Sequence, residues 1–240
     1  SYADKATRFG PWQKSNMEEL AKRNEAYMTR TVKWSAADVE TFTIPELQAD
    51  RKYFPARTVA MDDWCEFLGW FCSEGSVSRV NGQVYSLQLS QRDNANLAAM
   101  VAVCERMGLN PRKYQSGRED GWQVHVHSAQ LSRWVAQLGK NCLDKRIPDC
   151  IRNASARQIE IFLSAYLRGD GYRKRGTDIY YTSSPGMADD LQELIIKTGN
   201  DSHLHRRSLA GKPIKFKTHT ATSSTDGYVV SSHPAQRVKY

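Results

Sequence analysis

The stretches Phe67–Gly75 (FLGWFCSEG) and Leu163–Gly171 (LSAYLRGDG) decide the fold, because they are two versions of one pattern. In each, apolar residues recur at the spacing of one helix face and run into an acidic residue followed by glycine. Glu74-Gly75 ends the first stretch and Asp170-Gly171 ends the second, and glycine is a typical helix stop. The sequence therefore predicts two equivalent helices, over about 63–74 and 156–170, each ending in a carboxylate.

The starts of the two helices carry capping signals. Asp63 and Glu66 are a candidate capped start for the first, and Ser155 with Gln158 forms a capping box before the second. The apolar face of the first helix consists of Trp64, Phe67, Leu68 and Phe71, and that of the second of Ile159, Phe162, Leu163, Tyr166 and Leu167.

The segments that follow each helix also match, so the chain contains an internal duplication. Residues 84–90 alternate as a strand, with Tyr85, Leu87 and Leu89 expected on the core face, and residues 178–183 are the counterpart. Helices are predicted over about 94–107, before Gly108, and 186–198, before Gly199. Strands over 124–127 and 214–217 follow, and a helix over 129–138 closes the first repeat.

These elements predict an α+β protein made of two pseudo-symmetric αββαββ(α) repeats with antiparallel, saddle-shaped sheets. We assign residues 1–60 to an N-terminal extension, with a helix near 16–29, residues 61–138 to the first repeat and residues 139–154 to a linker. Residues 155–240 then hold the second repeat and a C-terminal tail. No pattern in the sequence assigns a function to the extension. A DNA-contact arm and a remnant of a larger protein are both compatible with it.

Composition narrows the class of protein. The 240 residues carry a net charge of +8, and 40% are hydrophobic, which excludes wholesale disorder. No apolar run is long enough to cross a membrane, and no signal-peptide pattern opens the chain. The five cysteines have no CxxC pair, which favours buried thiols in a reducing, intracellular compartment, cytoplasmic or nucleoid-associated, over disulfides or zinc. The positive charge permits a nucleic-acid partner without requiring one.

The duplicated acids are the strongest candidates for chemistry. A carboxylate is unfavourable at the negative end of a helix dipole, so Glu74 and Asp170 call for a compensating cation. If the two helices pair about a pseudo-twofold axis, with small Gly69 and Ala165 permitting close approach, the two acids converge. Their oxygens, with nearby carbonyls, would suit Mg²⁺. The alternative is two unrelated surface acids before helix-ending glycines.

A polar and basic surface is the second candidate feature. The outer face of each sheet is expected to be open to solvent, and it can read base edges and neutralise phosphates; a merely solvated face is the alternative. We place on it Gln88, Ser90, Gln123, His125, His127, Tyr180, Thr182, Lys215 and Lys217. Nearby loops add Arg79, Arg92, Lys113, Arg118, Arg173, Lys174, Arg175, Arg206, Arg207 and Lys212. His125 and His127 could also chelate a metal, but no third ligand is near in sequence.

Together, the two nine-residue segments and the elements after them resemble the LAGLIDADG (dodecapeptide) homing endonucleases over about residues 61–224. The resemblance implies a monomer that clamps a double-stranded DNA site beneath two sheets. It also implies Mg²⁺-dependent cleavage of both strands across the minor groove, leaving short 3′ overhangs. Two or three metal ions are implied, and Mn²⁺ or Ca²⁺ can substitute in binding.

The resemblance also assigns roles to individual residues. Glu74 and Asp170 become the metal-binding acids, and the residues before them, Ser73 and Gly169, offer carbonyl oxygens to metal. Gln91 matches the family's pocket glutamine, whereas the second repeat has Ser183 there. Lys217 matches the pocket lysine, and the first repeat has His127 instead. This asymmetry leaves open unequal cutting of the strands, or a weakened relative that binds DNA or RNA as a regulator or maturase.

Members of this family often reside in inteins. Ser1 would fit the first residue of an intein, but the chain ends Arg-Val-Lys-Tyr240, without the His-Asn pair of a splicing domain. Self-splicing is therefore not expected, and either an excised intein endonuclease or a freestanding one remains open. Residues 1–60 are then either a DNA-contact arm or an intein remnant.

Overall fold

The computed structural model describes residues 32–49, 52–116, 121–215 and 220–234, except for the side chains at 214, 215 and 221. The chain divides into two compact units, Ser1–Arg30 and Thr31–Tyr240. The description below concerns the second unit. Residues 32–60, which we grouped with the N-terminal extension, thus belong to the same unit as the two repeats.

The first repeat follows the predicted order of elements. It consists of α3 (Met61–Glu74), β5 (Gly75–Val80), β6 (Gln83–Gln91), α4 (Asn94–Arg106), β7 (Pro111–Gln115), β8 (Trp122–Val126), α5 (Ala129–Val135) and a 3₁₀ turn (Ala136–Leu138). Its four strands form an antiparallel sheet in the order β5-β6-β8-β7. The predicted strand over 124–127 is β8, and the predicted closing helix is α5 with its 3₁₀ turn.

The second repeat begins after the short helix α6 (Asp149–Arg152) of the linker. Its elements are α7 (Ala156–Asp170), β9 (Gly171–Lys174), β10 (Thr177–Thr182), α8 (Pro185–Lys197), β11 (Asp201–Arg207) and β14 (Gly227–His233). The sheet order is β11-β14-β10-β9, also antiparallel. The fold is therefore α+β with a four-stranded antiparallel sheet in each repeat, as predicted.

The fourth strand of the second sheet corrects a prediction. We expected it over 214–217, but residues in this range form β12 (Pro213–Lys215), which pairs with β13 (Thr220–Thr222) in a separate hairpin. The strand that completes the sheet is β14, which we had left in the C-terminal tail. The reason is that β14 has no alternation of buried and exposed residues: all of its residues are half-buried except fully buried Val230, so its place becomes clear only beside its neighbours β10 and β11.

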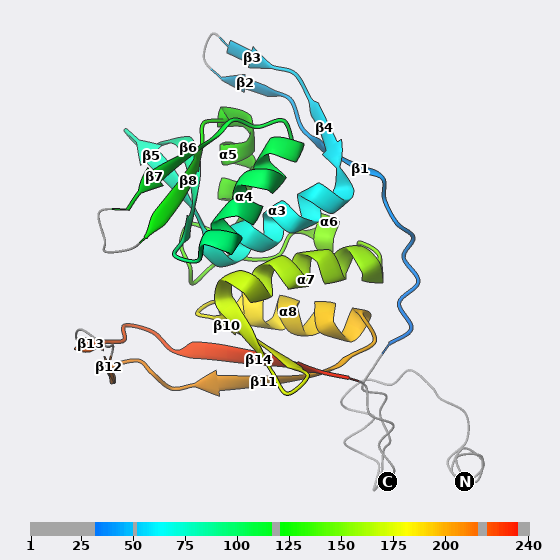
Figure 1. Ribbon diagram of the computed structural model, residues 1–240, viewed down its shortest axis with the longest axis vertical. Coiled ribbons are helices and arrows are strands. Elements are labelled where there is room, and N and C mark those ends of the chain that lie inside the picture. Colours follow the sequence, from blue (N-terminus) through cyan, green and yellow to red (C-terminus); the bar gives the residue numbers. More distant parts are fainter. Residues whose placement is uncertain (1–31, 50–51, 117–120, 216–219, 235–240) are drawn as a thin grey trace, which may run out of the picture. The chain divides into compact units, whose positions relative to one another are not determined.

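Helices α3 and α7 lie side by side at the centre of the unit (Figure 1). A methyl group at Gly69 would lie 2.5 Å from the Phe162 carbonyl oxygen and 2.7 Å from the Ala165 Cβ. The absence of a side chain at Gly69 therefore allows the two backbones to touch, as predicted. In Figure 1 the first sheet stands beside α4 and α5, and the second lies beneath α8, so the helices separate the two sheets.

Four helices begin at a side-chain cap, whereas α3 and the short α6 have none. Ser155, Asp93, Ser128 and Ser184 each accept a hydrogen bond from a first-turn amide of their helix. The predicted capped start of α3 is wrong, because the helix begins at Met61 without a side-chain cap. The Met61 amide instead donates to the Glu40 carbonyl at 2.9 Å, so the preceding segment closes this helix end.

Two strand faces also differ from the prediction. Leu87 and Leu89 are buried as expected, but Tyr85 is 59% exposed because the β5–β6 register shifts between Ser78 and Arg79. The extra residue of such a bulge turns one side chain to the other face. Tyr180, expected on the open face of β10, is 3% exposed and packs near Tyr166 in the core.

The segment before α3 connects both repeats. It forms a ribbon of β1 (Thr41–Ile44) with β4 (Arg57–Ala60) and of β2 (Leu47–Ala49) with β3 (Lys52–Phe54). Phe42 stacks on Trp64 of α3 at 4.4 Å between ring centroids. On the other side, buried Gln158 of α7 exchanges hydrogen bonds with both backbone groups of Val39. The segment therefore ties the N-terminal ends of α3 and α7 together.

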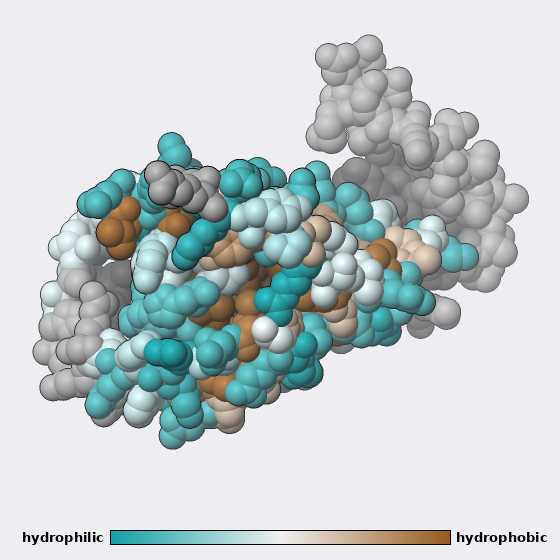
Figure 2. Space-filling model, turned by 90° about the horizontal axis from the view of Figure 1, so that it is seen from above, coloured by the Kyte–Doolittle hydropathy of each residue, from teal (hydrophilic) through white to brown (hydrophobic). Residues whose placement is uncertain are grey.

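Seen from above the view of Figure 1, the described surface is mostly hydrophilic, with hydrophobic residues showing through its middle (Figure 2). Among the described residues, none of the helices combines the length and apolar character that a bilayer crossing requires.

Candidate functional site

The C-terminal ends of α3 and α7 bring the two duplicated acids together. Gly169 packs against the turn that holds Ser73 and Glu74: a Cβ at Gly169 would collide with the Ser73 side chain and lie 2.9 Å from Glu74 Cγ. Ser73 turns its hydroxyl back into its own helix, donating to the Gly69 carbonyl at 3.0 Å. Gly169 has no side chain, and the Ser73 hydroxyl points back into its own helix. The C-terminal ends of α3 and α7 can therefore lie in contact.

The electrostatics show that the two carboxyl groups interact. Burial, reinforced by the nearby Asp170 charge, raises the pKa of Glu74 to about 7, although Gln91 and Lys145 act in the opposite direction. Burial raises the pKa of Asp170 to about 6, and Lys145 opposes this shift. Both carboxyl groups are therefore harder to ionise than exposed ones, which is typical of functional sites, and a nearby cation would favour their charged forms.

Gln91 lies at this site, at the end of β6. Its Nε2 donates to Glu74 Oε1 at 3.2 Å, and its Oε1 accepts from the Arg92 amide at 2.8 Å. The second repeat has Ser183 at the corresponding strand end, where it lines the pocket described next. A side-chain amide is therefore present only where the first repeat borders the site, as the sequence indicated.

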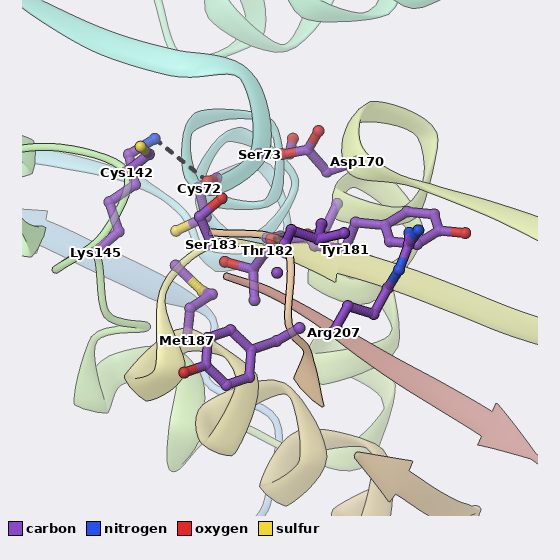
Figure 3. Close-up of a pocket in the computed structure, with 14 residues that line it drawn as sticks. Cys72, Ser73, Cys142, Lys145, Asp170, Tyr181, Thr182, Ser183, Met187 and Arg207 are labelled. Atoms are coloured by element: carbon purple, nitrogen blue, oxygen red, sulfur yellow. Dashed lines mark hydrogen bonds between the residues drawn. The ribbon is translucent and has the colours of Figure 1, made fainter. Parts of the chain in front are cut away.

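A pocket of about 270 Å³ opens beside the acids, on the side of the second repeat (Figure 3). Its walls come from α3, the linker, α7, β10, α8, β11 and β14, and Asp170 is the acid of the pair that lines it. They include Cys72, Ser73, Lys145, Asp170, Tyr181, Thr182, Ser183 and Arg207. In Figure 3 the Arg207 side chain runs alongside Tyr181 and the Lys145 ammonium points to the end of α3. Cations therefore lie on two sides of this pocket.

Lys145 is a site residue that the sequence analysis missed. It stands in the linker between the repeats, and its Nζ donates to the Phe71, Cys72 and Gly75 carbonyls at the end of α3. Burial lowers the pKa of its ammonium group, while Cys72, Asp170 and Glu74 oppose that shift. No local pattern marks this lysine, because the linker reaches the site only through the tertiary fold.

One proposed pocket residue, His127, is not brought to the acids. β8 runs antiparallel to β6, pairing Trp122 with Gln91 and Val126 with Leu87. His127 follows Val126, so it lies toward the opposite end of the strand, where its ring contacts Tyr85 at 5.6 Å. We had placed it at the strand end next to the acids, which the register contradicts. Lys217 lies outside the described residues, as does Arg118.

The outer face of the first sheet carries most of the residues predicted there. Ser90 and Gln123 are paired across β6 and β8, as are Gln88 and His125, all on the face opposite buried Leu89 and Val124. The register adds Arg112 and Tyr114 of β7, which we had not predicted. Lys113 pairs with buried Val124 and so belongs to the other face of β7. Arg79 and Arg92 are exposed at the strand ends.

Four rings form a continuous row on this outer face. Tyr85 contacts His127, His127 lies 6.4 Å from His125, and His125 contacts Tyr114 at 4.9 Å. Arg112 and Tyr114 are two positions apart in β7, and this strand spacing could have placed Tyr114 on the outer face from the sequence.

The second sheet keeps some of the predicted residues and loses others. Its outer face holds Lys174, Arg207, His203 and His205, while Tyr180 belongs to the core and is not a surface residue. Thr182 is half-buried and lines the pocket. The exposed arginines Arg173 and Arg206 are paired with Asp178 and Asp226. Arg175 and Lys212 are exposed in turns, and Lys215 is in β12 with its side chain outside the described part.

The donor set at the helix ends fits a hard divalent cation. Within the described stretches, no group of three or more His, Cys, Asp and Glu side chains could hold a metal. The acid pair supplies two carboxylates, and helix-end carbonyls lie beside them. Mg²⁺ is commonly held by one or two carboxylates, with water or phosphate completing its shell. A cation between the acids would also favour their charged forms, which burial disfavours.

No model of a known protein family matches the chain. Its fold is that of the homing endonuclease I-DmoI. A structure of mesophilic I-DmoI variants has a TM-score of 0.50 and 10% identity over 72% of this chain and 88% of that one. I-DmoI in complex with DNA and Mn has the same TM-score and identity over 72% and 89%. The homing endonuclease I-WcaI, bound to its DNA recognition sequence, has a TM-score of 0.44 and 12% identity over 72% and 76%.

Proposed function

We propose that this protein is a site-specific double-strand DNA endonuclease of the LAGLIDADG type that depends on Mg²⁺. The observation that carries the proposal is the meeting of Glu74 and Asp170 at the ends of two paired helices. Each helix leads directly into one of two antiparallel sheets with polar outer faces. The fold likeness to I-DmoI, which was crystallised with DNA and Mn, supports this assignment.

The two acids, with the Ser73 and Gly169 carbonyls, would hold the divalent ions. Bound metal would lower the pKa of an attacking water and stabilise charge on the transferring phosphate and the leaving 3′ oxygen. Gln91 fixes the Glu74 carboxylate through its amide and holds its own orientation through the Arg92 amide. Arg207 and Lys145 place positive charge near the pocket, where a phosphate would need it.

The sheet faces would recognise the DNA. Gln88, Gln123 and His125 can reach base edges, and Arg112, Lys174 and Arg207 can neutralise phosphates. Because one chain contains both repeats, a single copy provides both halves of the site, and we expect a monomer. Cleavage across the minor groove with short 3′ overhangs is the outcome that the family resemblance implies.

A second candidate function is binding without cleavage. It is favoured by the asymmetry of the site, since Ser183 stands where the first repeat has Gln91. A relative weakened in this way would bind nucleic acid as a regulator or maturase and leave the strands intact.

Selection of cleaved molecules from a randomised DNA library, with Mg²⁺ and with EDTA, tests the assignment. We expect Mg²⁺-dependent double-strand cuts that Glu74→Gln or Asp170→Asn abolishes while DNA binding is retained. Asp149→Asn, a change of an exposed acid outside the pocket, is the control and should cut normally. Binding of selected DNA without any cleavage would favour the second function, and wild-type cutting by either site variant would refute the acid assignment.

A further inference from the structure

Negative charge from three sources meets at the end of α3. The last carbonyl groups of a helix lack amide partners and carry partial negative charge. Glu74 adds a carboxylate at this end, and Asp170 adds another from the facing helix. In a partly buried place, water screens such charges poorly, so the arrangement requires a cation even before any metal binds.

Lys145 provides that cation. Its Nζ donates to the carbonyl oxygens of Phe71 at 3.0 Å, Cys72 at 3.3 Å and Gly75 at 2.6 Å, and it lies 5.1 Å from the centre of the Phe71 ring. These carbonyls flank Ser73 and Glu74 in the chain. One ammonium group therefore brackets the turn that carries the first acid, and its charge also acts on Asp170.

The linker holds this lysine firmly on the second repeat. The next residue, Arg146, makes two hydrogen bonds of 2.7 Å to Asp190 of α8, and the Ile147 amide donates to the same carboxylate at 2.9 Å. The Ser184 hydroxyl, which caps α8, donates to the Lys145 carbonyl at 2.9 Å. The backbone of Lys145 is thus fixed to one repeat while its side chain reaches the other.

We propose that Lys145 is a positioning residue of the acid pair. It fixes the end of α3 against the second repeat, and it is the internal counter-ion that keeps Glu74 and Asp170 together when no divalent ion is bound. Its effect on cleavage rests on the proposed nuclease function, whereas its electrostatic effect on the folded chain does not.

Lys197 offers a matched control in the same molecule. Its Nζ donates to the Arg152 carbonyl at 2.6 Å and to Glu193 Oε1 at 2.6 Å, and it lies 4.0 Å from the centre of the Trp34 ring. Like Lys145, it donates to a backbone carbonyl and lies over an aromatic ring, and it adds an ion pair with Glu193, but it stands at the other end of α8 from Ser184 and outside the pocket. A purely structural role for both lysines predicts similar consequences when either is removed.

The first experiment compares Lys145→Met, Lys145→Arg and Lys197→Met in single-turnover DNA cleavage, well below their unfolding temperatures. We expect Lys145→Met to slow cleavage on the order of 10²-fold, as small displacements of catalytic groups do, with the Kd for DNA unchanged. Lys145→Arg should recover part of the rate because it keeps the charge, and Lys197→Met should cut at the wild-type rate. Equal rates for the two methionine variants would overturn the proposal.

The second experiment does not depend on cleavage. Urea midpoints are measured at pH 8 with EDTA for Lys145→Met in the wild-type and in the Asp170→Asn background. A counter-ion predicts a larger loss of midpoint in the wild type than in Asp170→Asn, whereas equal losses would refute it. If the wild type cuts no DNA but this coupling is present, the nuclease assignment fails and the counter-ion role of Lys145 stands.

Discussion

Removing one acid of the pair should stabilise the metal-free protein. Burial and the Asp170 charge raise the pKa of Glu74 from the ordinary 4.5 to about 7. Because the folded pKa lies above the unfolded one, the stability linked to this group is full below about pH 4.5 and is lost as the pH rises to about 7. A shift of this size corresponds to about 3 kcal/mol, and solvent screening at the half-buried side chain reduces it to about 2 kcal/mol.

Glu74→Gln keeps the size of the side chain and its ability to accept from Gln91, but it cannot ionise. In urea unfolding with EDTA at pH 8, we expect the variant to be about 2 kcal/mol more stable than the wild type. At pH 4 the two should be equal. Glu105→Gln, on the exposed side of α4, is the control and should change little at either pH.

Addition of Mg²⁺ or Mn²⁺ at pH 8 should reverse the order. The wild type should gain stability from a cation that binds only the folded acid pair, and the variant should gain less. A Glu74→Gln variant that is less stable than the wild type at pH 8 without metal would refute the reasoning, because it would mean that the carboxylate stabilises the fold.

Three further predictions concern the helix pair and the sheet faces. Gly69→Val should lower the free energy of unfolding in urea by about 3 kcal/mol or more, because a side chain there meets the α7 backbone. Ala98→Val, on the exposed side of α4, should lower it by under about 1 kcal/mol. Arg112→Ala should weaken DNA binding and reduce by about 1 the slope of log K for DNA against the logarithm of salt concentration. Lys113 belongs to the opposite face of β7, so the same loss in Lys113→Ala would contradict the assigned register. Tyr180→Ala should cost about 3 kcal/mol of stability and leave that salt slope unchanged, and a changed slope in a fully folded variant would place Tyr180 at the DNA surface after all.

Several features of the fold could be predicted from the sequence because they depend on local periodicity. The apolar stripes of α3 and α7, the acid-glycine ends and the alternation around Leu87 and Leu89 are contained in short segments. The duplication added a second, independent instance of each, and it placed Glu74 and Asp170 at equivalent helix ends. Gly69 and Ala165 indicated how closely those helices could approach, and the structure has them in contact.

The features that could not be predicted depend on contacts between distant segments. β14 joins the sheet because β10 and β11 offer their edges, although a separate hairpin occupies the predicted position. A one-residue bulge moves Tyr85 to the outer face. The register of an antiparallel pair takes His127 away from the acids, since each strand runs back along its neighbour.

The sequence by itself determined that the chain is a duplicated α+β protein with one carboxylate at the end of each core helix. Helix periodicity and the glycines that end helices depend only on a few neighbouring residues. Only the tertiary structure decided what neutralises those carboxylates inside the chain. Lys145 lies far from both acids in sequence, and its ammonium group reaches the end of α3 only because Asp190 and Ser184 hold the linker against the second repeat. Electrostatic interaction depends on distance in space, which the order of residues does not specify.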